Sequence, residues 1–478
     1  MKPKQSRRLD CFARLCPPEG GLWRARKDAS GICASVLIVV ILLLAPSLSW
    51  AMAKRPPVQV PQITALAVSP LPLTLQDSYE LALQQSETLA IAKEDIEEAE
   101  AQFFIAASEA LGDVNFVMER NRLDSKGRVD STTDSSLTDP DRRTRKFVIK
   151  QPLFQGFKAM GALTGAGSLR KEQKEEWLRA KQLLFLDVAS AYYGFLREKD
   201  DLKTIDEISS LFKERIQELE GREGIGRSRS SEVVTARSRM KTLDAERARV
   251  HGTFLLAQHL LEFLTGVDWK ERDMKDEALP EEPAKTLDEY LIEVDSRPDV
   301  EAARQGVKTA WRGVIVAQSK FWPELSVEHT QYERREGSQS GIDWDFLFKI
   351  DVPLFQGGAA VGGLKKAVSL WKKEKLGFQK TRREAERDIK DSYEKWFSSQ
   401  AEHRALEEAA QATEENFRLQ KDDYAHNLVG NLDVLEALEE FYQTRRDATR
   451  AFYQMKENYW RLRIASGEIP AEGTNEPL

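Results

Sequence analysis

The sequence predicts a mainly α-helical chain that also contains four β-strands and is built as two repeats of one plan. Two long segments, 153–279 and 354–469, contain no proline. Proline in a helix interior removes a hydrogen bond and kinks the helix, so proline-free runs of this length favour long helices. A short stretch before each run alternates between apolar and polar residues, which is typical of a strand.

Residues 1–53 are predicted to be a secretory signal peptide. Basic residues precede an apolar run that ends in small residues at Ala51 and Ala53, as a cleavage site requires, so the mature chain would begin at Lys54. A retained single-span anchor is the alternative, because the apolar run is long. All three cysteines lie in this segment, and none directly follows the apolar run, where a lipid-accepting cysteine would stand. We therefore expect a mature chain without disulfides, thiolate metal ligands or lipid.

The remaining chain is acidic and has no long apolar segment. The signal peptide carries eight basic and three acidic residues, a net charge of +5, so the formal charge of −7 for the whole chain becomes −12 after cleavage. Such a chain is not expected to bind nucleic acid, which needs basic side chains for its phosphates. Beyond Lys54 no apolar run approaches the roughly 20 residues of a membrane-spanning helix. Any membrane crossing is therefore expected to use strands.

After a linker at 54–73, two repeats are expected at 74–280 and 281–469, followed by a C-terminal tail at 470–478. Each repeat is predicted to run in the order helix, strand, strand, long helix, turn, helix. Residue types of the second repeat match those of the first at a constant offset of 201. Matching pairs include Pro152 and Pro353, Tyr192 and Tyr393, and Gly266 and Gly467.

The predicted strands lie at about 113–121 and 144–151 in the first repeat and at about 324–333 and 343–352 in the second. In the last of them, one side is aromatic or apolar and the other is largely charged. The first side contains Trp344, Phe346, Phe348 and Ile350, and the second contains Asp345, Leu347, Lys349 and Asp351. Periodicity alone fits half-buried strands of a soluble sheet. The flanking amphipathic helices need their apolar stripes for one another, however, so bilayer lipid is the expected cover for the aromatic side.

Four strands from one chain cannot cross a membrane alone, because open sheet edges would leave backbone N–H and C=O groups unpaired in hydrocarbon. Copies of the chain must therefore close a barrel. Two copies would give eight strands and an interior filled by side chains, whereas three would give twelve strands and a lumen. A lumen suits charged inward residues such as Lys349 and Asp351. Trp322 and Trp344, near strand ends, fit a position at the membrane interface.

Each strand pair ends in the same motif, QPLFQG from Gln151 and VPLFQG from Val352, and the stretch LDVLEA begins at Leu432. In these features, from Leu73 to Gly467, the chain resembles the TolC family of outer-membrane efflux channels. The resemblance implies a homotrimer in the outer membrane of a Gram-negative cell, with a 12-stranded β-barrel in lipid and antiparallel coiled-coil helices that form an α-barrel in the periplasm. It also implies a passive exit duct for efflux or type I secretion, with a periplasmic adaptor and an inner-membrane efflux or ABC transporter as partners.

Two kinds of turn carry candidate sites. The strand-to-helix turns contain proline, which suits a strand end or a first helical turn, and glycine, which permits a sharp change of direction. These residues are Pro152, Gly156, Pro353 and Gly357. The far helical turns are expected to form the periplasmic tip and to contact the adaptor. Their residues are Ile225, Gly226, Arg227 and Ser228 in the first repeat, and Asn427, Leu428, Val429 and Gly430 in the second. Asn427 stands where the first repeat has Gly226, and asparagine tolerates the positive φ that such a turn needs.

Asp433 and Glu436 lie three residues apart on one helix face just after the second far turn. The resemblance implies that this acidic pair lines the narrow periplasmic end of the tunnel. The first repeat has Glu232 at the position of Asp433, but Thr235 at that of Glu436. A trimer would gather about six carboxylates around one axis and attract cations. The alternative is two solvated acids near a helix N-terminus, where negative charge is favourable.

No pattern in the sequence points to an enzyme, a cofactor or a metal site. The five histidines contain no metal-spaced pair, and the carboxylates share helix faces with lysine and arginine, where solvated pairing explains them. The main rival to a channel is a periplasmic adaptor anchored in the inner membrane by the apolar run. An adaptor predicts one coiled-coil hairpin and a separate β-rich domain, whereas this chain has two equal halves with strands at the same place in each. A purely structural coiled-coil rod does not account for the strands.

Overall fold

The computed structural model describes five stretches of the chain, all within one compact unit, Ala67–Leu478. They are residues 73–122, 141–269, 274–276, 285–336 and 339–468. The predicted signal peptide, all of the predicted linker except Leu73, and the predicted C-terminal tail lie outside the described residues.

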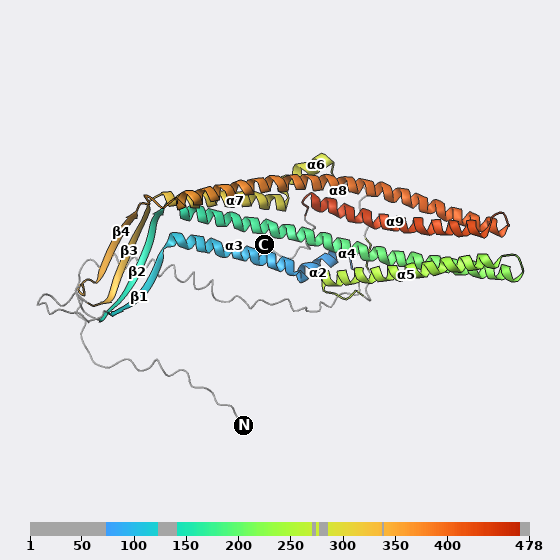
Figure 1. The fold of residues 1–478 in the computed structure, drawn as a ribbon, viewed down its shortest axis with the longest axis horizontal. Helices are drawn as coiled ribbons and strands as arrows, with labels where there is room; N and C mark the ends of the chain where they lie inside the picture. Colours follow the sequence, from blue (N-terminus) through green and yellow to red (C-terminus); the bar gives the residue numbers. More distant parts are fainter. Residues whose placement is uncertain (1–72, 123–140, 270–273, 277–284, 337–338, 469–478) are drawn as a thin grey trace, which may run out of the picture. The chain divides into compact units, whose positions relative to one another are not determined.

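Long helices make up most of the described chain, and the two longest are equal in length. α4 (Lys158–Gly224) and α8 (Ala359–Ala425) each contain 67 residues, and α8 begins 201 residues after α4. At 1.5 Å per residue each is about 100 Å long. Each is followed by a turn and another long helix, α5 (Ser230–Thr265) or α9 (Asn431–Ala465). The constant offset in the sequence is therefore a repeat of structure (Figure 1).

Shorter helices open each repeat. They are α2 (Leu75–Gln85) and α3 (Glu87–Leu111) in the first repeat, and α6 (Leu287–Ile292), η2 (Glu293–Ser296), α7 (Pro298–Gln318) and η3 (Ser319–Phe321) in the second. α2 and α6 begin with the same capping box. A threonine, Thr74 or Thr286, exchanges hydrogen bonds with an acidic residue three positions later, which satisfies backbone groups that the first turn of a helix leaves free.

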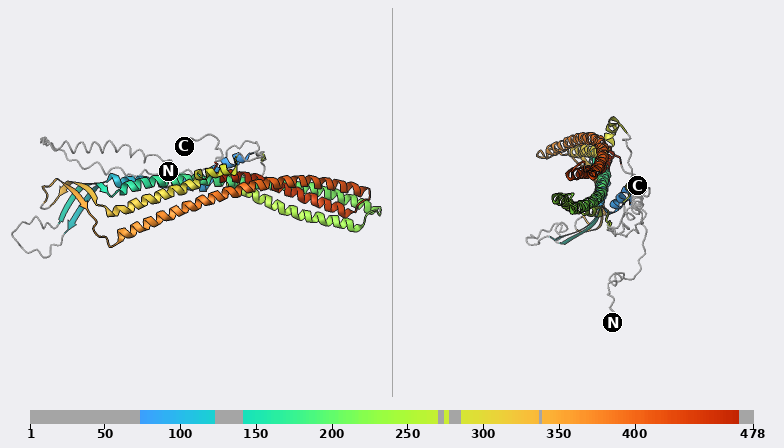
Figure 2. Two further views of the ribbon diagram at one scale, coloured as in Figure 1. Left: turned by 90° about the horizontal axis from the view of Figure 1, so that it is seen from above. Right: turned by 90° about the vertical axis from the view of Figure 1, so that its right-hand side faces the viewer.

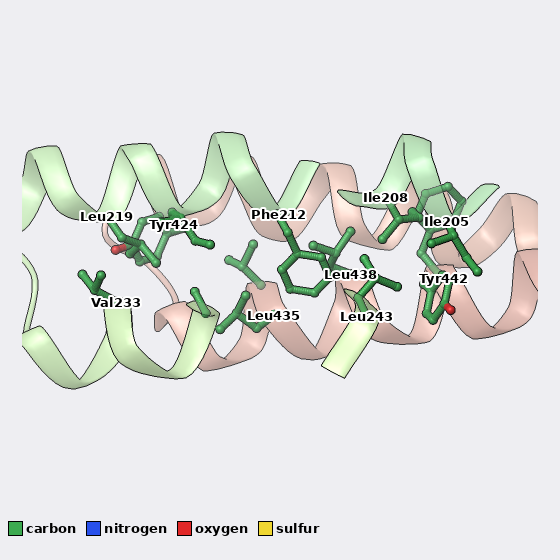
Figure 3. Close-up of a cluster of buried hydrophobic side chains, with 14 of the residues drawn as sticks. Ile205, Ile208, Phe212, Leu219, Val233, Leu243, Tyr424, Leu435, Leu438 and Tyr442 are labelled. Atoms are coloured by element: carbon green, nitrogen blue, oxygen red, sulfur yellow. The ribbon is translucent and has the colours of Figure 1, made fainter. Parts of the chain in front are cut away.

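The helices bury part of their apolar residues against one another. α4 contacts α2, α3, α5, α7 and α9, while α8 packs against α7 and α9. Side chains of α4, α5, α8 and α9 form one buried apolar cluster in which Phe212, Leu435 and Leu438 lie close together (Figure 3). Two further clusters join α2 and α4 to α9, and α6 and α7 to α8 and α9. None of the helices in the described stretches is both long enough and apolar enough to span a membrane.

Four strands form one antiparallel sheet in the order β1-β2-β3-β4. They are β1 (Asp113–Arg122), β2 (Asp141–Gln155), β3 (Glu324–Arg335) and β4 (Trp344–Asp351). Long helices with a small antiparallel sheet confirm the predicted fold class. β2 runs further than expected, because it includes Pro152 at an irregularity in its pairing with β3, whereas β4 ends before Pro353. A bulge tolerates proline, which has no N–H to donate to the ladder.

The strand register places the apolar sides of all four strands on one face of the sheet. Phe116 lies opposite Phe147, with ring centroids 4.9 Å apart, and the same face continues across β3 to β4. Its apolar members are Val114, Phe116, Met118, Phe147, Ile149, Leu325, Val327, Trp344, Phe346, Phe348 and Ile350. Phe116, Phe346 and Phe348 are 51%, 60% and 51% exposed. The opposite face is mainly polar and includes Lys146, Glu328, Asp345 and Lys349.

Candidate functional site

The sheet joins the long helices through two glycine turns. Gly156 has φ +58° and Gly357 has φ +57°, a left-handed conformation that glycine adopts without strain. The next residue in the first turn is Phe157, which also has a positive φ, of 65°. Its ring packs edge-on against Phe154 and Trp322, at centroid distances of 5.4 Å and 6.1 Å. The aromatic contacts hold Phe157 in a conformation that a non-glycine residue rarely adopts.

The surroundings of the two glycines differ. A β-carbon on Gly156 would lie 2.7 Å from the β-carbon of Trp322 and 2.8 Å from the carbonyl oxygen of Ser319. A β-carbon on Gly357 would meet no atom within 4 Å. Glycine at the first turn is therefore required by both backbone conformation and space, and at the second by conformation alone.

The far helical turns share one backbone plan. Both lie at the end of the long helices away from the sheet (Figure 1), and Figure 2 shows them from two further directions. Gly226 has φ +75°, and Asn427, at the matching position, has φ +61°. Asn427 thus adopts the positive φ expected of it. The turns of the two repeats keep the same conformation despite different residues.

An arginine–tyrosine cluster joins the two far turns. The guanidinium groups of Arg215 and Arg222 both contact the ring of Tyr424, with their central carbons 3.7 Å and 4.3 Å from the ring centroid. Arg215 also donates hydrogen bonds of 3.0 Å and 2.9 Å to the amide oxygen of Asn431, and Arg222 donates one of 2.7 Å to that of Asn427. The first hairpin, formed by α4 and α5, therefore contacts both ends of the second turn through these two arginines of α4.

The eight predicted tip residues differ in exposure. Ile225 and Leu428 are 67% and 73% exposed, and Gly226, Arg227, Asn427 and Gly430 are exposed as well. Val429 is half-buried against the apolar cluster of the hairpins. Ser228 is half-buried too, and its hydroxyl bonds to the carboxylate of Glu232. Each turn thus exposes a large apolar side chain, and the first turn also exposes the charged side chain of Arg227.

Asp433 and Glu436 are both exposed on the first turns of α9. The carboxylate of Asp433 accepts a hydrogen bond of 2.7 Å from the backbone N–H of Gly430, so it caps the helix N-terminus. The side chain of Glu436 has no hydrogen-bond or ion-pair partner among the described residues. This arrangement gives Asp433 a local structural role in addition to the pore role predicted for the pair.

A buried network of ion pairs was not predicted from the sequence. Arg446 of α9 is 1% exposed, and its guanidinium group donates hydrogen bonds to Asp201 of α4 and Glu246 of α5. It also donates one of 2.8 Å to Oδ2 of Asp201 and one of 2.7 Å to the hydroxyl of Tyr442. Burial acts to lower the pKa of Arg446, but its bonds to the two carboxylates outweigh burial and raise that pKa. A signal was available, because Arg446 follows Leu435, Leu438 and Tyr442 at helical spacing on an otherwise apolar stripe.

Comparison with known proteins identifies a family and several relatives whose sequences are similar to that of this chain. The chain matches the outer membrane efflux protein family over residues 78–267 and 293–468. It is 22% identical over 411 residues to the alkaline protease secretion protein AprF of Pseudomonas aeruginosa, covering 83% of this chain and 85% of that protein. It is 20% identical over 401 residues to the cation efflux system protein CusC of Escherichia coli O157:H7, covering 81% and 84%.

Solved structures share the fold. The outer membrane protein VceC of Vibrio cholerae has a TM-score of 0.73 and 22% sequence identity, over 82% of this chain and 96% of that one. The MtrE outer membrane channel of Neisseria gonorrhoeae has a TM-score of 0.69 and 20% identity, over 82% and 88%. Since the family match extends through both repeats and most of the chain, this protein belongs to the outer membrane efflux protein family.

Proposed function

We propose that this chain is the outer-membrane exit duct of a tripartite efflux or type I secretion system. It would conduct substrates passively from a periplasmic adaptor and an inner-membrane pump to the exterior. The observation that carries the proposal is the exposed aromatic face of the sheet, in a chain that belongs to the outer membrane efflux protein family. Lipid stabilises such a face, whereas the long helices form their buried apolar clusters with one another.

The edges of the sheet support closure by copies of the same chain. β1 and β4 are the end strands, and each has one hydrogen-bonded neighbour within the described residues. Free edges in hydrocarbon need partners. In the proposal, three copies join twelve strands in one barrel, with the polar face and residues such as Lys349 toward the lumen. The helices of the same homotrimer would form the periplasmic tunnel.

The proposal does not assign the transported substrate. AprF is named for protease secretion and CusC for cation efflux. A duct that conducts passively takes its selectivity from the pump beneath it. The far turns, at 225–228 and 427–430, are the proposed contact with the adaptor, because each exposes a large apolar side chain, Ile225 or Leu428, and the first also exposes Arg227.

Expression with the native leader tests the proposal. We expect the chain in the outer-membrane fraction, beginning at Lys54, with the mass of three chains in mild detergent and with channel conductance in planar bilayers. N-terminal sequencing, mass measurement and current recording check these points in turn. A monomer that begins at Met1 in the inner-membrane fraction would support an anchored adaptor instead.

The acidic pair gives a further expected result. Asp433→Ala combined with Glu436→Ala should lower the cation-to-anion permeability ratio of the reconstituted channel by roughly several-fold at low salt, because clustered carboxylates in a narrow pore attract cations. A matched control is Glu94→Ala combined with Asp95→Ala, which removes two exposed acids from α3. If the two double variants conduct alike, Asp433 and Glu436 act only as surface acids and helix cap.

A further inference from the structure

The two far turns share a backbone but differ in charge. Residues 221–240 contain five arginines and two glutamates, whereas the matching residues 422–441 contain six acidic residues and no lysine or arginine. At the turn itself, Leu428 stands where the first repeat has Arg227, and Gly430 stands where it has Arg229. Because the fold of the two turns is the same, this charge difference is not needed to form them.

Most arginines of the first hairpin tip are engaged within the chain. They and their partners are Arg215 with Asn431 and Glu218, Arg222 with Asn427, Arg237 with Glu220, and Arg239 with Glu439. These side chains hold the hairpins together and satisfy their own charge. They are therefore unavailable to a partner without loss of an existing contact.

Arg227 and Arg229 are the exception. Both are exposed, and neither side chain has a hydrogen-bond or ion-pair partner among the described residues. They lie on either side of Ser228 in the first far turn, where Ile225 is 67% exposed, and Val234 on the first turns of α5 is 62% exposed. Two unpaired guanidinium groups beside apolar side chains form a surface suited to carboxylates carried on an apolar helix end.

We propose that Arg227 and Arg229 recognise an acidic segment at the helical tip of the periplasmic adaptor. This inference rests on the proposed function and adds the charge of the partner. Carboxylates of the adaptor would pair with the two guanidinium groups, and an apolar residue beside them would contact Ile225. The acidic residues that follow the second turn, such as Asp433, would repel the same segment. The difference in charge between the two turns therefore directs the acidic segment to the first turn. It thereby sets the orientation in which the adaptor binds.

The test measures binding of the adaptor that co-purifies with the wild-type protein, identified by mass spectrometry and then expressed alone. Arg227→Glu combined with Arg229→Glu should weaken its binding to the detergent-solubilised protein by roughly tenfold or more at low salt, mainly through slower association. The difference should shrink at about 0.5 M salt, where charges are screened within a few Å. Arg227→Lys with Arg229→Lys should keep most of the affinity, and reversing acidic residues in the adaptor tip to lysine should restore binding to the glutamate variant.

The matched control is Lys372→Glu combined with Lys373→Glu. It makes the same change in net charge on exposed residues of α8, near the sheet and far from the tip. This control should bind the adaptor as the wild type does. Arg227→Gln with Arg229→Gln provides a milder variant if charge reversal impairs folding.

Other outcomes overturn the inference. If the adaptor binds the wild type and the glutamate variant equally, the charge assignment is wrong although the duct remains. If the glutamate variant loses its oligomeric state, the arginines pair with a neighbouring copy instead. If they are needed to bind phosphatidylglycerol vesicles but not the adaptor, they serve a lipid surface. Equal adaptor binding after replacing both turns, 225–229 and 426–430, with glycine and serine would reject the proposed tip contact itself.

Discussion

Arg446→Met should lower the free energy of unfolding by about 3–5 kcal/mol, because it leaves the carboxylate of Asp201 buried without its main partner. Asp201 is 3% exposed, and among the described residues the cation left beside it after the substitution is Arg450, at 3.6 Å. The network joins α9 to α4 and α5, so the loss should loosen the packing of the two hairpins. Thermal or urea unfolding, followed by helical circular dichroism in detergent, measures the effect.

Two comparisons separate this cause from a general loss of charge. Arg461→Met removes an exposed arginine of α9 that pairs with Glu457 one turn away, and should change stability by less than about 1 kcal/mol. Neutralising Asp201 as well, with Asp201→Asn, should recover part of the stability, since no unpaired buried charge remains at that position. Equal losses for Arg446→Met and Arg461→Met would mean that burial does not decide the cost.

The same network predicts a pH dependence. Burial acts to raise the pKa of Glu246, but the hydrogen bond and charge of Arg446 outweigh it and hold that pKa below its usual value of 4.5. A carboxyl with a lowered folded pKa contributes stability above its unfolded pKa and loses that contribution as pH falls through the folded pKa. The wild type should therefore lose stability below about pH 4.5, and Arg446→Met should lose less over the same range.

Gly156→Ala should destabilise the protein by about 3–5 kcal/mol and reduce the yield of folded protein in the membrane. An alanine with left-handed backbone costs roughly 1–2 kcal/mol. The added methyl group must also displace Trp322 or the backbone of Ser319, both of which lie within 3 Å of its position. Yield after extraction and the midpoint of thermal unfolding check this result.

Gly357→Ala is the internal control for Gly156→Ala. The two glycines have nearly the same φ, but the space around Gly357 is open. Gly357→Ala should therefore cost only the roughly 1–2 kcal/mol of its backbone conformation. Similar losses for both variants would show that backbone conformation, and not the contact with Trp322 and Ser319, sets the requirement at Gly156.

Local patterns in the sequence predicted much of this fold. Proline-free runs predicted α4 and α8, and the offset of 201 predicted that they are equal in length. Period-two alternation placed the apolar residues of each strand on one side, and the register then joined those sides into a single face. The positive φ of Asn427 followed from its match to Gly226. These features depend on neighbours in the chain, whose geometry a helix or strand fixes.

The tertiary structure decided what lies between distant segments. Helical spacing placed Arg446 on an apolar stripe, but its partner Asp201 lies 245 residues away and its repeat equivalent is Ala245, so neither local spacing nor the internal repeat identified the partner. Gly156 and Gly357 occupy equivalent turns, yet only the packing of η3 against the first makes its space critical. Tertiary packing also decided which arginines of the first hairpin are paired. The packing of the helices supplies partners to most of them and leaves the side chains of Arg227 and Arg229 without a partner in the described chain. The sequence by itself thus determined the repeated helices and strands and their apolar faces, since those follow from local backbone periodicity. Contacts between elements far apart in the chain decided which side chains are buried, paired or left free.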